Sequence, residues 1–186
     1  DNGNNTNWDF SGSDAGIRYW VASAPGNWSD SSNWGIFSGQ SGGASVPTST
    51  QTVVFDGANG KNGDVTVNMV VNISSFTMNG YSGTFNTNGT SVTVNHSFLQ
   101  ATGTISLGTS SITMNGDFVR TAGTFNANTS SVTFSSAVNS TLSAGGASFY
   151  KVNINKTSGS TVTLSGVVDI RHGLDINSGI LSFSRV

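Results

Sequence analysis

Residues able to carry out acid–base chemistry are few and scattered along the chain. The 186 residues include nine Asp and two His, but no Cys and no Glu. Hydrolysis by a general acid and base needs carboxylate or imidazole groups that converge on one bond. Only Asp169 and Asp175, close in sequence to Arg171 and His172, form a local group. Asp169 and Arg171 share one face of a strand by spacing, so we interpret them as a surface ion pair.

Patterns that could hold a metal ion are equally sparse. His96 and His172 are isolated from each other, and neither has the spacing of a metal site. The loop at residues 56–64 is rich in Asp, Asn and Gly and could bind calcium. Lys61 in its middle and the lack of a bidentate Glu favour a tight turn instead. We therefore predict a protein with no enzymatic activity, metal or cofactor.

Composition and charge narrow the class of partner and the location. The net charge is −2 and the seven Lys and Arg are scattered, which argues against nucleic acid as a partner. No apolar run approaches the roughly 20 residues that a membrane-spanning helix needs. Ser, Thr, Asn and Gly make up 98 residues, and the chain begins with Asp1. We expect an extracellular or cell-surface protein whose signal peptide has already been removed.

An internal repeat of 20 residues organises most of the chain. Residues 91–110 and 111–130 are identical at 8 of 20 positions without a gap. A Gly-Thr-apolar triplet recurs at the same interval, beginning at Gly83, Gly103 and Gly123. Inside each unit apolar and polar residues alternate, which is typical of short, half-buried strands. Such a unit cannot bury its own apolar face and must stack on its copies.

This repeat predicts an all-β fold, a single-stranded parallel β-helix with about 20 residues per coil. A right-handed coil is the default for parallel crossovers. Repeated antiparallel hairpins are the alternative, but Asn-Gly turns do not recur at one fixed place in every unit. We expect residues 1–42 to form an N-terminal arm and Trp-rich cap, and residues 43–186 to form about eight coils.

Residues 20 apart should then lie one above another as columns. Three inward columns are expected to begin at Phe85, Val92 and Val94, and a fourth is expected to join Phe98, Phe118 and Val138. An amide ladder should join Asn95 to Asn115, and the Thr residues at positions 93, 113 and 133 should face outward.

The two ends of the chain differ from its middle. All four Trp residues lie in the first 42 residues. The first coil of a solenoid exposes an apolar cross-section, which Trp side chains could cover. A glycan-stacking platform formed by Trp20, Trp28 and Trp34 is the alternative. At the other end, the chain from Gly179 onward continues the repeat and carries no evident cap.

An uncapped coil favours end-to-end assembly, in which a polar arm from a neighbour pairs with the open edge. If copies of the chain do not assemble, we expect the chain to be a piece excised from a longer protein. The candidate assembly residues are Trp8, Phe10, Ile180, Leu181, Phe183 and Val186.

The motifs also resemble a known group of proteins. The stretch GNWSDSSNW, a following Pro, and DGANG after a VVF strand look like the N-terminal module of large, repeat-rich bacterial surface proteins. The segments GTFNANTSSVTF, ASFYKVNINK and TVTLSGVVDI are similar to the parallel β-helix repeats of the same proteins, among them autotransporter-passenger-like adhesins. The resemblance implies an extracellular, mostly non-enzymatic protein, although such proteins usually have many more coils.

Taken together, the sequence predicts an extracellular structural protein, the subunit of a self-assembling head-to-tail filament or fibre. The predicted partner is therefore a second copy of the chain. A glycan-binding adhesin module of a larger surface protein, with cell-surface glycans as partner, is the alternative. A polysaccharide lyase or hydrolase is a third class, which would need carboxylates or bases stacked on neighbouring coils.

Overall fold

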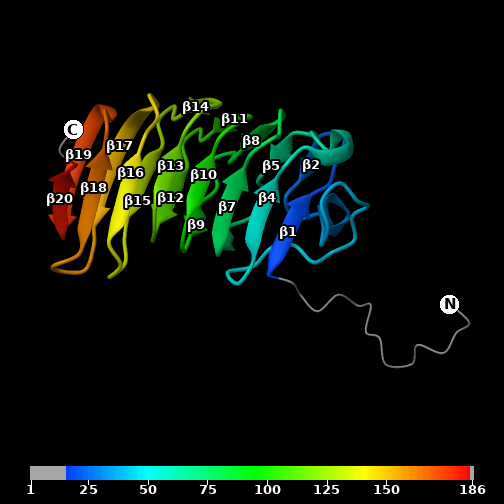
Figure 1. Cartoon of the computed structure of the whole chain (residues 1–186), viewed down its shortest axis with the longest axis horizontal. Helices are drawn as coiled ribbons and strands as arrows, with labels where there is room; N and C mark the ends of the chain where they lie inside the picture. Colours follow the sequence, from blue (N-terminus) through cyan, green and yellow to red (C-terminus); the bar gives the residue numbers. More distant parts are fainter. Residues whose placement is uncertain (1–15, 185–186) are drawn as a thin grey trace, which may run out of the picture.

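The computed structural model describes residues 16–184 and forms one elongated β-solenoid (Figure 1). Strands make up 46% of the chain, and the coils number about six, with ~21 residues in each. In the described range the helical segments are two short 3-10 turns, η1 (Ser31–Asn33) and η2 (Ala58–Gly60). The predicted all-β parallel β-helix is confirmed, and the alternative of antiparallel hairpins is wrong.

Three sheets run along the long axis, and strands follow each other from sheet to sheet around every coil. Sheet A contains, in spatial order, β20 (Ile180–Phe183), β18 (Thr161–Ser165), β16 (Ser140–Ser143), β13 (Phe118–Arg120), β10 (Phe98–Gln100), β7 (Ser75–Met78), β4 (Thr52–Phe55), β1 (Ile17–Trp20) and β3 (Trp34–Gly35). Sheet B contains β14 (Thr124–Asn126), β11 (Thr104–Ser106), β8 (Thr84–Asn86), β5 (Val65–Thr66) and β2 (Gly26–Asn27). Sheet C contains β19 (Asp169–Ser178), β17 (Ser148–Asn155), β15 (Ser131–Phe134), β12 (Ser111–Met114), β9 (Val92–Val94) and β6 (Val71–Ile73).

The repeat sets the register of the central coils. Ile105 pairs with Phe85 on one side and with Phe125 on the other, and Ile112 lies between Val92 and Val132 in the same way. Alternate residues of each strand point inward, so these columns fill the core with β-branched and aromatic side chains. Met114 likewise lies between Val94 and Phe134, so the three predicted inward columns are confirmed.

An amide ladder closes one corner of the coils. Asn115 Nδ2 donates to Asn95 Oδ1 at 3.0 Å, and Asn95 Nδ2 donates to Asn72 Oδ1 at 2.7 Å. The predicted pair is therefore present, and the ladder continues one coil further, to Asn72. These side-chain hydrogen bonds run along the axis, parallel to the backbone ladders.

The prediction for the fourth column was wrong at Val138. Phe98 pairs with Phe118 as expected, but Phe118 then pairs with Leu142, 24 residues later. The corner between β15 and β16 holds the extra residues, and it contains Ser136 at φ 80° and Val138 with 66% of its side chain exposed. The structure contains about six coils, where even spacing predicted about eight.

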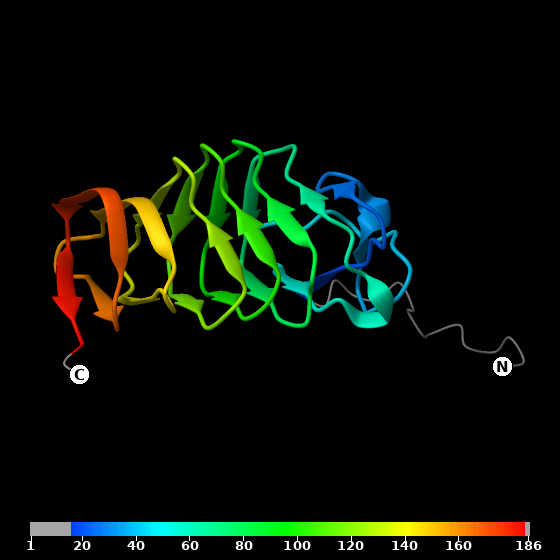
Figure 2. The same ribbon diagram turned by 90° about the horizontal axis from the view of Figure 1, so that it is seen from above.

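The cross-section changes near the C-terminal end. Sheet B stops at β14, whereas sheets A and C continue through the last coils. Sheet C lengthens at the same place, because β17 has 8 residues and β19 has 10, against 4 in β15. The last coils therefore contain two strands each instead of three, and Figure 2 shows this end from above.

The N-terminal end of the core is closed by Trp side chains. Trp20, Trp28 and Trp34 are each no more than 1% exposed. Trp34 packs edge-on against both of the others, with ring centroids 5.1 Å and 4.6 Å apart. The indole of Trp20 donates to the Gly63 carbonyl, and that of Trp34 to the Trp28 carbonyl. The short strand β3 pairs antiparallel with β1 and covers the edge of sheet A.

Candidate functional site

The C-terminal coil exposes side chains that belong to the core columns. Leu174 lies over Val152, and Ile176 lies over Ile154. Both residues underneath are almost fully buried, whereas Leu174 and Ile176 are 42% and 52% exposed. The register of β19 directs both side chains toward the core. They are exposed because no further coil among residues 16–184 covers them.

Strand β20 repeats this arrangement in sheet A. Leu181 lies over the buried Val162, and Phe183 lies over Leu164. Phe183 is 72% exposed, while Leu181 is half-buried and packs against the core. Ile180 pairs with Thr161, so its side chain points to the opposite face of the strand from Leu181. It is 49% exposed. We call the set of Leu174, Ile176, Leu181 and Phe183 the open end.

The structure locates only part of the predicted assembly site. Trp8, Phe10 and Val186 lie outside the described residues. Leu181 and Phe183 are brought together, with Ile180 beside them on the opposite strand face. Sequence reasoning missed Leu174 and Ile176 because it did not anticipate a 10-residue strand in sheet C. The signal in the sequence was a pair of apolar residues two positions apart, at 152 and 154, which recurs at 174 and 176.

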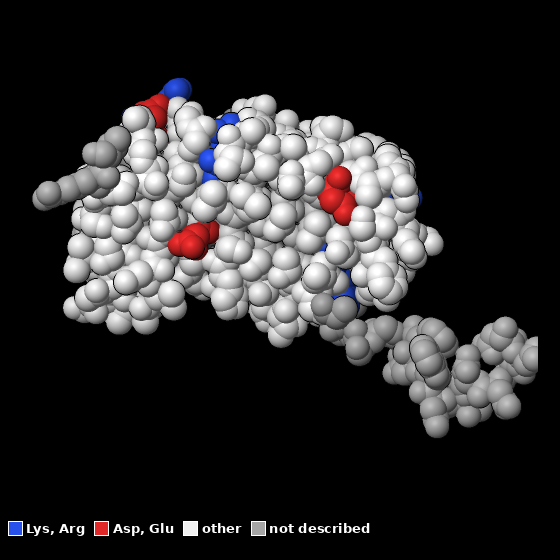
Figure 3. Space-filling view, in the orientation of Figure 1, with Lys and Arg blue, Asp and Glu red and all other residues white. Residues whose placement is uncertain are grey.

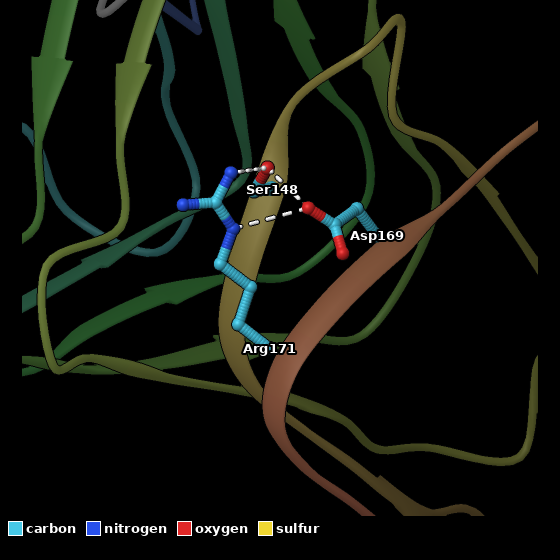
Figure 4. A network of polar contacts seen from close by, with 3 residues as sticks. All are labelled: Ser148, Asp169 and Arg171. Carbon is cyan, nitrogen blue, oxygen red and sulfur yellow. Dashed lines mark hydrogen bonds and ion pairs between the residues drawn. The ribbon is translucent and has the colours of Figure 1, made fainter.

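A small polar network borders the last coil on the sheet C side (Figure 4). Arg171 Nε lies 3.1 Å from Asp169 Oδ2, and the Ser148 hydroxyl donates to the same oxygen at 2.6 Å. Arg171 Nη2 also contacts the Ser148 hydroxyl at 2.9 Å. The hydrogen bond from Ser148, followed by that from Arg171, holds the pKa of the Asp169 carboxyl below its usual value. The predicted ion pair is confirmed.

Two further contacts attach β19 to β17. The Lys151 ammonium lies 2.7 Å from Asp175 Oδ2, and His172 stacks on Tyr150 with ring centroids 4.4 Å apart. Asp175 is thus engaged with Lys151. The stacked rings and ion pairs stabilise the last coil without making a convergent acid–base set.

The remaining candidate residues mostly support turns. Asp56 Oδ1 accepts from the Ala58 backbone N–H, and Asp64 Oδ1 accepts from that of Thr84. The predicted tight turn at residues 56–64 is present. His96 Nδ1 lies 3.1 Å from the Ser74 hydroxyl. Across residues 16–184 no three His, Asp or Glu side chains gather closely enough to hold a metal ion.

The predicted glycan-stacking platform is wrong. A sugar ring stacks only on an indole face that reaches the surface, and Trp20, Trp28 and Trp34 are 0%, 1% and 0% exposed. Their polar context in the sequence suggested surface loops, but the three rings pack on one another to close the core.

The outer surface is sparsely charged. Figure 3 shows a few acidic and basic side chains on one face, with wide neutral areas between the groups. Within residues 16–184, the structure contains no helix with the length and hydropathy of a membrane span.

The fold defines the class of protein, a parallel β-solenoid, and within residues 16–184 the last coil leaves core-column side chains exposed. Comparison of the chain with family models, curated proteins and solved structures found no match.

Proposed function

We propose that this chain is a non-enzymatic structural protein whose copies assemble head to tail into a filament or fibre. The single observation that supports this is the open end, where inward-facing core residues are 42–72% exposed apart from the half-buried Leu181. The opposite end is closed by the three buried Trp residues. A contact between two different ends leaves one end free on each of the two copies. Unless the rotation between copies closes a ring, further copies add to these free ends and a filament forms.

The free energy for assembly comes from two sources at this end. Covering a large apolar side chain contributes about 1.5–3 kcal/mol when its burial is complete. The outer edges of β19 and β20 also present backbone groups that a further strand can pair with. The chain carries few charged residues, which limits repulsion between copies along their sides.

The proposed location is the cell surface or the extracellular space. The chain is rich in Ser, Thr, Asn and Gly. Repeat-rich bacterial surface proteins with parallel β-helix repeats, which the sequence resembles, fit this location. We propose the same setting for this chain.

Substitution of Phe183 tests the proposal directly. Phe183→Asp places a charge on the open end but leaves the stacked coils beneath it intact, because Phe183 is already 72% exposed. We expect the variant to keep its strand content by circular dichroism and to lose polymers in analytical ultracentrifugation. Leu181→Asp should act in the same direction but also loosen the last coil, since Leu181 packs against the core.

Val138→Asp is the matched control. Val138 is 66% exposed, but it lies in a corner between β15 and β16, away from the open end. The control variant should assemble like the unaltered chain. Polymers of undiminished length from the Phe183→Asp variant would rule out assembly through the open end.

A further inference from the structure

A second open edge lies within the molecule, where sheet B stops. β14 pairs with β11 on one side, and within residues 16–184 it has no strand of sheet B on the other. The chain instead makes a turn through Gly146 and enters β17 directly. A hollow of about 510 Å³ remains at this step, lined by β14, by residues 146–150 and by Arg120 and Arg171.

The backbone of β14 is oriented for strand addition. The Thr124 N–H donates to the Gly103 carbonyl, and the Asn126 carbonyl accepts from the Leu107 N–H. In a parallel ladder, bonding to a given neighbour alternates from residue to residue. The N–H and carbonyl of Phe125 therefore point away from β11, into the hollow.

The hollow favours an acidic occupant. Of the described residues that line it, two are Arg and none is acidic. Arg171 uses two nitrogens on Asp169 and Ser148, and its side chain remains 71% exposed. Arg120 binds backbone carbonyls of Gly123 and Gly145, and its buried Nε has no hydrogen-bond partner within residues 16–184.

We propose that residues 9–11 of a neighbouring copy add to β14 as the missing strand of sheet B. This inference rests on the proposed self-assembly. The segment reads Asp-Phe-Ser, and the strands β8, β11 and β14 read Thr-Phe-Asn, Thr-Ile-Ser and Thr-Phe-Asn, the same polar–apolar–polar pattern. Residues 1–15 also contain three Asp and no Lys or Arg, which complements the two Arg of the hollow. Phe10 would then pack against Phe125 and Phe149, which line the hollow and contact each other with ring centroids 5.3 Å apart.

The length of the chain shows that the donor is a second copy. The missing strand lies level with β16, five strand spacings or about 24 Å along the axis from β1. The five peptide units from Ser11 to Gly16 span at most about 18 Å when fully extended. A molecule therefore cannot place its own residues 9–11 in its own hollow. The hollow is two strand spacings, about 10 Å, from the outer strand β20.

Directed disulfide formation tests this docking, because the natural chain contains no Cys. Strand addition in parallel register places Ser11 opposite Asn126, with Cα atoms about 5 Å apart, within the range of a disulfide. Ser11→Cys protein is mixed with Asn126→Cys protein under mild oxidation and analysed on a non-reducing gel. Asn86→Cys is the matched control, since Asn86 is the equivalent exposed residue of β8, which has strands on both sides.

We expect at least tenfold more cross-linked dimer with Asn126→Cys than with Asn86→Cys. Polymer formation by the same mixtures is measured in parallel by ultracentrifugation. Polymers without the selective cross-link would overturn the docking at β14 and leave the proposed filament standing. A selective cross-link without polymers would support the docking and refute the filament, and failure of both measurements would refute both.

Discussion

Lys156 is a charged residue in an almost fully buried position. It follows β17, and its side chain is 1% exposed. Its ammonium donates to the Val138 carbonyl and to the hydroxyls of Ser140 and Ser136. Burial lowers the pKa of Lys156, and the charge of Asp117 opposes that shift in part. The ammonium thus anchors the irregular corner between β15 and β16 from one coil away.

Lys156 should give the folding stability a recognisable pH dependence. Between its lowered folded pKa and the usual value near 10.5, the unfolded chain binds more protons, so the free energy of unfolding should rise with pH. Lys156→Met lacks this contribution. Urea titrations of both proteins from pH 7 to about pH 10 should show a steeper rise for the unaltered chain.

The titrations stop at about pH 10 because Tyr81 affects the stability above that pH. Burial raises the pKa of the Tyr81 hydroxyl, which donates to the Gly63 carbonyl. A raised folded pKa contributes stability that is lost as pH rises above the unfolded value of about 10, which is the opposite slope. Parallel stability curves for the two proteins below that pH would contradict the role assigned to Lys156.

At the scale of the elements, a stack of aromatic rings joins successive strands of sheet A. Phe76, Phe98 and Phe118 lie one above another, with ring centroids 4.7 Å and 4.6 Å apart and interplanar angles of 8° and 7°. Each ring contacts the next at the strand spacing of the solenoid. A change in the middle ring therefore affects three coils at once.

Phe98→Ala should destabilise the fold by about 3–5 kcal/mol, the usual cost of removing a buried Phe. Val138→Ala should change stability by no more than about 0.5 kcal/mol, because Val138 lies outside the column. Chemical denaturation of both variants measures the difference. If both variants lost the same free energy of unfolding, Val138 would belong to the buried column that the even 20-residue spacing predicted. That result would contradict the register of Phe118 with Leu142.

The sequence predicted the central coils well because each residue there lies over its copy. The columns of Phe85 and Val92 follow directly from a spacing of 20. The corners carry no such constraint, and a few extra residues between β15 and β16 displaced the register at Val138. The end of sheet B was also missed, since Gly145 and Gly146 signal a turn but not the loss of a strand.

Part of the candidate site was predictable for the same reason. Leu181 and Phe183 continue an alternating strand near the end of the repeat, and the structure places both at the open end. The Trp-rich cap was predictable for a related reason, because the first coil of a solenoid exposes an apolar cross-section that large side chains can cover. The particular contacts between β1, β3 and the loops around them were not predictable, since local sequence does not encode them.

At the scale of the whole molecule, assembly joins two different ends, and the cap offers an apolar residue of its own. Phe37 follows β3 and is 59% exposed. Phe37→Asp should weaken polymers as Phe183→Asp does. A mixture of the two variants should then form dimers and stop, because one intact cap and one intact open end remain to pair.

Sedimentation velocity of the mixture measures this outcome. Each variant alone should sediment as a monomer, and the mixture should show a dimer without longer species. Homodimers of either variant alone would indicate a symmetric contact between like ends, which the head-to-tail arrangement does not allow.

Electron microscopy of the purified chain at increasing concentration tests head-to-tail assembly most directly. We expect unbranched fibres that lengthen with concentration and are lost in the Phe183→Asp variant but retained in Val138→Asp. Isolated particles at every concentration, or fibres that persist when Phe183 is replaced, would contradict it.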